Sequence, residues 1–233
     1  METKSITKLQ AAKFASDYLT QRDNALAIQV IDGWVWNYET KRKLFPVVEM
    51  DERESELFDR VTECFISSGS MFAGCLKNAG ILSTIIDELT YKINVIDHLK
   101  SKETRVFWES HKRVFNDFYL KDSEYEFVYE KAKGNEKKIR DSIDAGFVVI
   151  CSIWIKPWYP SGRGHLIVIK GYVLDDNGNV TAWICDDPFG DCLTKYINHN
   201  GHDVRYDMNN WKKMMGSPED KPRLFGYVRK KLK

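Results

Sequence analysis

The stretch that decides the fold is GHLIVIKGYVLDDNGNVTAWICDDPFG, residues 164–190. It contains two apolar runs, 164–174 and 180–187, which flank the polar turn sequence DDNGN at 175–179. Continuous apolar runs of this length are typical of buried strands, and an Asn-Gly turn between two of them is typical of a β-hairpin. The stretch therefore predicts two antiparallel strands in the interior of a sheet.

The sequence on either side of the hairpin extends this sheet. The apolar run FVVICSIWI at 147–155 predicts another buried strand, and EKKIRDSIDAG at 136–146 predicts a helix in front of it. Beyond the hairpin, 187–196 predicts a turn followed by a further strand. A short helix is expected at 205–215 and a closing strand at 223–232.

The first 120 residues are predicted to be mostly helical, except that 25–50 are expected to form short strands or an irregular insertion. Apolar residues recur at helical spacing over 5–19. CFISSGSMFAGCLKNAG at 64–80 predicts a buried helix whose small residues let neighbours approach closely, with Gly80 as its C-terminal cap. Residues 81–120 are also helical in pattern, although 93–99 could form a strand. Helices followed by an antiparallel sheet make an α+β fold.

Length and composition indicate a soluble globular chain of one domain, or of one domain with an insertion. Hydrophobic residues make up 43% and charged residues 30% of the 233 residues. Lys and Arg number 35 against 34 Asp and Glu, so the net charge of +1 lacks the positive excess of most nucleic-acid binders. The basic segment at 221–233 is short, and we expect no nucleic-acid partner.

Cysteine usage and hydropathy indicate a reducing compartment. The cysteine count is odd and no C-x-x-C pair occurs, so we predict neither a disulfide framework nor a cysteine zinc site. Residues 1–14 lack the apolar core of a signal peptide, and no run approaches the ~20 apolar residues that span a bilayer. We expect a cytoplasmic protein without membrane insertion, although release by lysis would leave no mark on the sequence.

Three residues have the properties that thiol-dependent hydrolysis requires. Cys64 opens the predicted helix at 64–80, where the helix dipole stabilises a thiolate. His165 begins the first strand of the hairpin and Asp187 ends the second, 12 residues before and 10 residues after Asn177. The two strand ends are thus expected to meet, which predicts an imidazole base beside a carboxylate that orients it.

The hairpin resembles the His-to-Asp half of the bacteriocin-processing (leader-cleaving) cysteine peptidases and their broader papain-like relatives. The shared features are a Gly-His strand start, a Gly-Tyr pair, an acidic-Gly turn and an Asp-Pro followed by Gly. The matching positions are Gly164, His165, Gly171, Tyr172, Gly178, Asp187, Pro188 and Gly190. The resemblance implies a papain-like fold, in which a helical half packs on an antiparallel β-sheet, with His165 and Asp187 as catalytic residues.

The first half of the chain matches the same family pattern more loosely. Cys64 is followed by Ser67, Ser68 and Met71 at the family's spacing. QRDN at 21–24 resembles the family's early glutamine segment, which implies Gln21 as the oxyanion-hole donor. The gap of 43 residues between this glutamine and Cys64 exceeds the family's usual distance. Residues 25–63 are therefore interpreted as an insertion into a single domain, 1–233.

The resemblance implies a cysteine peptidase that hydrolyses peptide-type amide bonds through a thioester intermediate. Its substrate would be a peptide or a peptide-containing molecule, and no metal or organic cofactor would be required. Two alternatives stay open. One is a cell-wall (peptidoglycan) peptide hydrolase or an acyl transferase of the same fold, and the other is a catalytically inactive binding module that kept the fold. The sequence does not indicate an oligomeric state.

Two residues compete with the favoured catalytic positions. Cys75 lies about three helical turns beyond Cys64 and could face the same way, so it is the alternative nucleophile. Asp186 is the alternative orienting group, although adjacent strand residues face opposite sides of a sheet.

Other residues are candidates for ligand contacts. Trp158 and Tyr159 stand just before the turn that leads to the histidine, and we interpret them as substrate contacts. His199, His202 and Asp203 lie in an Asn/Gly-rich segment that is typical of a loop, and no third clear ligand accompanies the histidines. No metal site is therefore predicted.

Overall fold

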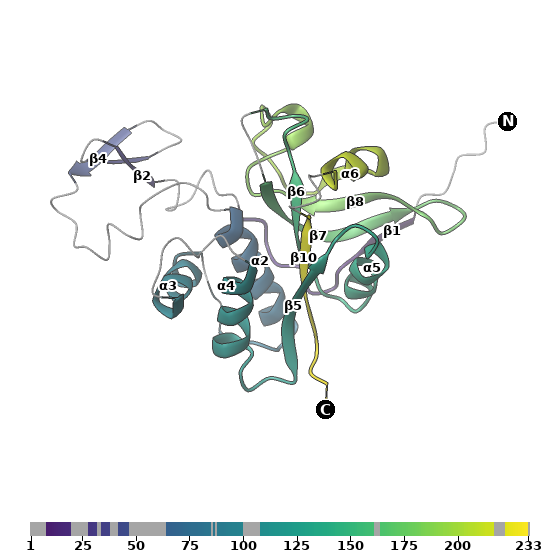
Figure 1. Cartoon of the computed structure of the whole chain (residues 1–233), viewed down its shortest axis with the longest axis horizontal. Coiled ribbons are helices and arrows are strands. Elements are labelled where there is room, and N and C mark those ends of the chain that lie inside the picture. The colour runs from purple at the N-terminus through teal and green to yellow at the C-terminus, as the bar shows by residue number, and fades with distance from the viewer. Residues whose placement is uncertain are drawn as a thin grey trace.

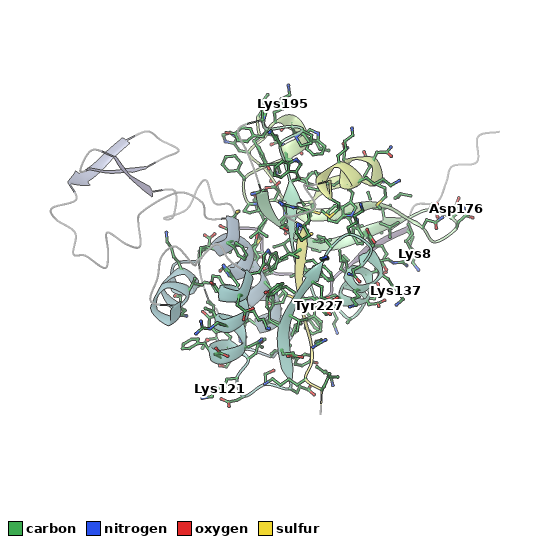
Figure 2. All side chains as sticks on the ribbon, viewed as in Figure 1. Lys8, Lys121, Lys137, Asp176, Lys195 and Tyr227 are labelled. Atoms are coloured by element: carbon green, nitrogen blue, oxygen red, sulfur yellow. The ribbon has the colours of Figure 1, made fainter. Side chains whose placement is uncertain are left out.

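The computed structural model describes residues 8–19, 28–31, 34–37, 42–46, 64–84, 86, 88–99, 108–160, 164–216 and 222–232. It shows an α+β architecture in which one large antiparallel sheet is covered by helices (Figure 1). Side chains fill the space between the sheet and its helices, whereas charged residues such as Lys121, Lys137 and Asp176 lie at the periphery (Figure 2).

Seven strands form the large sheet, in the order β5-β10-β6-β7-β8-β9, with β1 also beside β7. Their bounds are β1 Lys8–Ala11, β5 Tyr125–Lys131, β6 Val149–Trp154, β7 Gly164–Leu174, β8 Val180–Asp186, β9 Val204–Asp207 and β10 Leu224–Lys230. All neighbouring strands run antiparallel. The strands β6 and β7 lie in the middle of the order and are almost completely buried, as their continuous apolar runs predict.

The strands β7 and β8 form the hairpin that the sequence predicts. The side chain of Asp175 accepts hydrogen bonds from the backbone N–H groups of Asn177 (2.9 Å) and Asn179 (2.8 Å), which closes the turn. The hairpin returns the chain after β8 to the beginning of β7. Residues that are 22 positions apart in the sequence, such as His165 and Asp187, thereby become neighbours.

Helices lie on both faces of the large sheet (Figure 1). On one face are α2 Cys64–Asn78, α3 Glu88–Leu99, α4 Trp108–Arg113 and the π-helical turn η3 Val114–Tyr119, and on the other are α5 Glu136–Asp144 and α6 Met208–Met214. The strand alternative for 93–99 is wrong, because these residues belong to α3. None of the described helices combines the length and the apolar character needed to cross a membrane.

The helix α2 is buried, as its small residues predict. Residues 65–73 are all buried, so this helix has no exposed face along its first turns. Gly69 lies directly against the ring of Tyr91, and a Cβ at this position would collide with that ring. At the other end, Gly80 has a positive φ of 74°, and its N–H donates to a carbonyl of the last turn at 2.9 Å. Cys64 therefore begins a helix that is held in place on all sides.

The helix predicted at 5–19 is wrong for the residues from 8 onward. Residues 8–11 form β1, which pairs with the end of β7, and no helix follows within 12–19. Gly171 makes this pairing possible, because a Cβ at that position would lie 2.7 Å from the carbonyl oxygen of Gln10. The hydrogen bonds offered by β7 outweigh the helical spacing of a few apolar residues.

The strand predicted within 187–196 is also wrong. The chain there forms the short 3₁₀ turn η4, Cys192–Thr194, and then places Lys195 and Tyr196 at φ values of 59° and 61°. Two successive left-handed residues cannot continue a strand. The next strand, β9, comes only after this loop and pairs with β8.

Three further strands lie within 25–50, where short strands or an irregular insertion are predicted. They are β2 Ile28–Ile31, β3 Trp34–Asn37 and β4 Arg42–Pro46, and they form a separate antiparallel sheet. The remaining residues of 25–63 lie outside the described ranges. That 25–63 is an insertion stays a prediction.

Candidate active site

His165 and Asp187 form a direct side-chain contact at the meeting point of β7 and β8. The Nε2 atom of His165 lies 2.6 Å from Oδ1 of Asp187. Both side chains are buried, with 6% and 0% of their surface exposed. The register of the hairpin places the start of β7 beside the residues that follow β8. The imidazole of His165 and the carboxylate of Asp187 are thereby brought together.

The carboxylate of Asp187 is fixed by several hydrogen-bond donors. The hydroxyl of Tyr206 donates to Oδ2 (2.9 Å), and the backbone N–H of Phe189 donates to Oδ1 (3.0 Å). The hydroxyl of Tyr18 donates to the Asp187 carbonyl oxygen (2.9 Å), so the backbone is held as well. A fully buried carboxylate needs such donors. They fix the carboxylate in the orientation in which it meets the ring of His165.

Asp186 is directed away from His165. Its Oδ1 lies 2.8 Å from Nζ of Lys170 and 3.0 Å from Nδ1 of His202. The structure therefore gives this alternative orienting carboxylate a different set of partners from Asp187.

Asp186 also belongs to a cluster of side chains that have metal-ligand atoms. Asp186, His202 and Asp203 present ligand atoms within 4.8 Å of one another, and His199 does not belong to this group. The Lys170 ammonium contacts both carboxylates, at 2.8 Å and 2.7 Å. This ammonium lies between the two carboxylates and offsets part of their negative charge, and the absence of a metal site stays a prediction.

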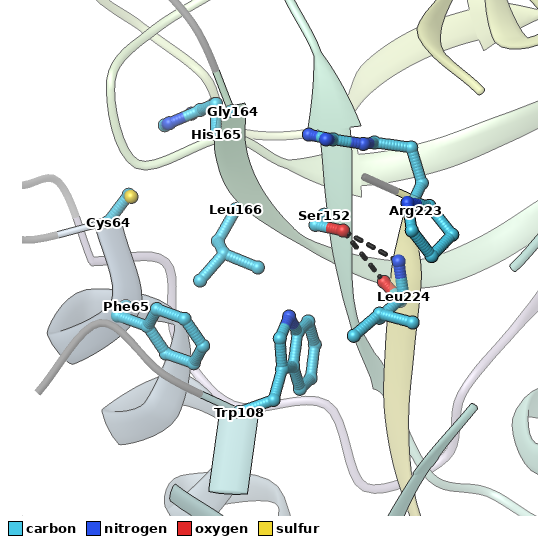
Figure 3. Close-up of a pocket in the computed structure, with 10 residues that line it drawn as sticks. Cys64, Phe65, Trp108, Ser152, Gly164, His165, Leu166, Arg223 and Leu224 are labelled. Atoms are coloured by element: carbon cyan, nitrogen blue, oxygen red, sulfur yellow. Dashed lines mark hydrogen bonds between the residues drawn. The ribbon is translucent and has the colours of Figure 1, made fainter. Parts of the chain in front are cut away.

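Cys64 and His165 line one cleft of about 320 Å³. Figure 3 shows the sulfur of Cys64 at the N-terminal end of α2, on the side of the cleft where His165 lies. The other lining residues are Phe65, Trp108, Ser152, Gly164, Leu166, Pro222, Arg223 and Leu224. The Cys64 side chain is close enough to the His165 ring to raise the pKa of that ring. Since Nε2 is engaged by Asp187, the ring nitrogen that remains for the thiol is Nδ1.

The electrostatic surroundings of His165 favour its protonated form. Burial alone lowers the pKa of His165, but the Asp187 carboxylate and, to a smaller extent, the Cys64 side chain raise it to about 10. The cleft therefore holds an imidazolium between a carboxylate and a sulfur. A protonated imidazole beside a thiol can donate the proton that a leaving group needs.

We expect His165 to stay protonated at pH 8, well above the ordinary pKa of 6.5. The folded chain keeps this proton up to about pH 10, whereas the unfolded chain releases it near pH 6.5. The resulting contribution to the free energy of unfolding is complete below about pH 6.5 and is lost as the pH rises toward 10. An NMR titration of the ring checks this. In Asp187→Asn the ring should titrate closer to 6.5, and a wild-type ring that is neutral at pH 8 would contradict the assignment.

The other four cysteines are buried free thiols. Cys75 has 0% exposed surface, and burial raises its pKa to about 11 even though the backbone N–H of Val148 lowers it slightly. Burial likewise raises the pKa of Cys151, Cys185 and Cys192. A protonated thiol without access to solvent is a poor nucleophile. Cys64, which is partly exposed, differs from all four.

Three of the predicted site residues are not among the described residues that line this cleft. Gln21 lies outside the described residues, so its role as oxyanion-hole donor stays a prediction. Trp158 and Tyr159 pack against the hydrophobic core, and the ring of Tyr159 meets that of Tyr196 edge to face at 5.6 Å. Neither is among the residues that line the cleft around Cys64.

Two cleft residues, Trp108 and Arg223, have no local sequence signal that would indicate a site. Trp108 begins α4 and Arg223 precedes β10, so the two lie 115 residues apart in the sequence. Only the packing of α4 against the sheet brings them to the same cleft.

Comparisons with known proteins show a distant structural similarity. No protein-family model matches the sequence, and no curated protein matches it significantly. Among solved structures, the crystal structure of a candidate C39-like peptidase from Bacillus anthracis is similar, with a TM-score of 0.34 and 19% identity. The matched region covers 54% of this chain and 61% of that one. At this low similarity, the geometry of the site alone carries the functional inference.

Proposed function

We propose that this chain is a papain-like cysteine peptidase that hydrolyses peptide-type amide bonds. In this proposal Cys64 is the nucleophile, His165 the acid and base, and Asp187 the group that orients the ring. One observation carries the proposal: Cys64 and His165 line a single cleft, and the buried Asp187 carboxylate binds Nε2 of the His165 ring. A thiol, an imidazole and a carboxylate in contact form the arrangement used for nucleophilic catalysis on several folds.

The proposed reaction has two stages. The Cys64 sulfur bonds to the amide carbonyl carbon, and the C–N bond breaks as Nδ1 of His165 donates its proton to the leaving nitrogen. The acyl group then remains on Cys64 as a thioester. Water attacks this thioester while His165 takes up a proton, so the carboxylic product leaves and the thiolate and imidazolium are restored. No oxidant, metal or organic cofactor enters either stage.

The N-terminus of α2 supports the charge that develops in this reaction. The first N–H groups of a helix have no partner within the helix, and they stabilise negative charge near its end. The first turn of α2 contains no acidic residue that would compete for them. We propose the backbone N–H of Cys64 as one oxyanion donor and Gln21 as the second.

Incubation of the purified full chain with a defined peptide mixture, and separately with peptidoglycan fragments, tests the proposed function. Mass spectrometry should find new amine and carboxyl termini with the wild type and none with Cys64→Ala. Products from the peptidoglycan fragments alone would identify a cell-wall hydrolase. Products joined to a second amine would identify an acyl transferase. If neither substrate is changed and Cys64 shows no selective reactivity, the chain is a binding module and the proposal is wrong.

A further inference from the structure

The cleft around Cys64 has an uneven distribution of charge. Among the described residues that line it, the ionisable side chains are Cys64, His165 and Arg223, and none is acidic. Most of the remaining wall is apolar, with Phe65 and Trp108 on the side of the helices. The charge of a protonated His165 is offset by the Asp187 carboxylate that it contacts, so the guanidinium of Arg223 gives its side of the cleft a positive charge that favours an anionic group over a cationic one.

The position of Arg223 is fixed by its neighbours on β6 and β10. The hydroxyl of Ser152 accepts a hydrogen bond from the N–H of Leu224 (2.7 Å) and donates to the Leu224 carbonyl oxygen (3.1 Å), which fixes the start of β10 (Figure 3). The Nη1 atom of Arg223 reaches the carbonyl oxygen of Ile153 at 3.5 Å. Its guanidinium carbon lies 5.4 Å from the centre of the Trp154 ring. The guanidinium is thus held in one place against the sheet.

The guanidinium lies next to the start of β7. A Cβ added to Gly164, the residue before His165, would be 3.0 Å from Nη1 of Arg223. The absence of a side chain at 164 therefore leaves the room that the guanidinium occupies. In Figure 3, Cys64 and Arg223 stand on opposite sides of the cleft, so a substrate attacked by Cys64 would extend toward the guanidinium.

We propose that Arg223 determines specificity by binding a carboxylate of the substrate, while the apolar wall at Phe65 and Trp108 receives an apolar group. This inference rests on the proposed peptidase function. A planar guanidinium can form two parallel hydrogen bonds with a carboxylate, which gives both strength and orientation. The carboxylate can belong to an acidic side chain near the scissile bond or to the free C-terminus of a short peptide.

Turnover of matched peptides by the full chain tests this proposal and separates the two sources of the carboxylate. One pair of peptides differs only in Glu against Gln near the cleaved bond, and a second pair differs only in a free against an amidated C-terminus. We expect kcat/KM to favour the charged member of one pair by roughly tenfold, as a charge-assisted hydrogen bond gives. The pair that shows the preference identifies the source.

Substitutions at 223 show whether this preference depends on the guanidinium. Arg223→Gln should remove the preference and Arg223→Lys should keep part of it. The matched control Arg205→Gln, on the exposed side of β9, should leave it unchanged. Equal kcat/KM for both members of both pairs in the wild type, with cleavage that still needs Cys64, would overturn the role of Arg223. The peptidase proposal would then still stand.

A second measurement does not require turnover. The rates at which the anion iodoacetate and the neutral iodoacetamide alkylate Cys64 give a ratio that depends on nearby charge. Arg223→Gln should lower this ratio by roughly threefold, as expected for one partly screened charge, and Arg205→Gln should not change it. If no peptide is cleaved, an unchanged ratio in Arg223→Gln overturns the inference.

Discussion

Replacement of Cys64 by alanine is expected to abolish amide hydrolysis, with kcat/KM lowered by roughly 10⁴-fold or more, as in other triads that lose the nucleophile. The sulfur is the atom that forms the thioester, and the cleft offers no ready substitute among its described residues. Ser152 is the only hydroxyl residue there, and its Oγ is already engaged by Leu224 on both sides. Steady-state kinetics on a peptide that the wild type cleaves measure the effect.

Cys75→Ala is the matched control, because it removes a thiol from the same helix. Cys75 is completely buried and remains protonated over the physiological range. We expect this variant to keep its kcat/KM and to lose only a modest part of the free energy of unfolding. Activity that survives in Cys64→Ala but disappears in Cys75→Ala would show that Cys75 is the nucleophile and would contradict the assignment to Cys64.

Asp187→Ala is expected to have the largest effect on stability, lowering the free energy of unfolding by roughly 3–5 kcal/mol. It leaves the buried His165 ring without its anionic partner and the Tyr206 hydroxyl without an acceptor at Oδ2. Turnover should fall as well, because nothing then fixes the orientation of the ring. Urea unfolding followed by circular dichroism measures the loss of stability.

Two further variants separate the charge of Asp187 from its shape. Asp187→Asn keeps a group of the same size and should lose less stability than Asp187→Ala, although the pKa of His165 should still fall. Asp203→Ala removes a carboxylate that is 59% exposed and pairs with Lys170, so its cost should stay within about 1 kcal/mol. Equal losses in Asp187→Ala and Asp203→Ala would contradict the structural role given to the buried carboxylate.

The parts of the fold that could be predicted from the sequence are those whose pattern is local. The hairpin at 164–187 and the helix at 64–80 have apolar runs, turn residues and a C-terminal glycine that each favour a single structure. The segment 8–11 could not be predicted in the same way. It forms a strand because it pairs with β7, and the residues of the segment alone do not indicate that pairing.

The same distinction between local pattern and tertiary packing applies to the residues of the candidate site. His165 and Asp187 become neighbours through a hairpin whose register follows from its turn, so the sequence indicates their contact. The approach of Cys64 depends on how α2 packs on the sheet, which spacing alone does not determine. Trp108 and Arg223 enter the cleft from α4 and from the start of β10, and their part in the site becomes visible only in three dimensions.

The most direct test of the central claim is the rate at which iodoacetamide alkylates each cysteine at pH 7, followed by mass spectrometry. An imidazolium in contact with Cys64 predicts that this thiol reacts before the other four and faster than the same thiol in the urea-unfolded chain. It also predicts that His165→Gln removes the advantage. A Cys64 that reacts no faster in the folded chain than in urea, or equally fast with and without His165, would contradict the account.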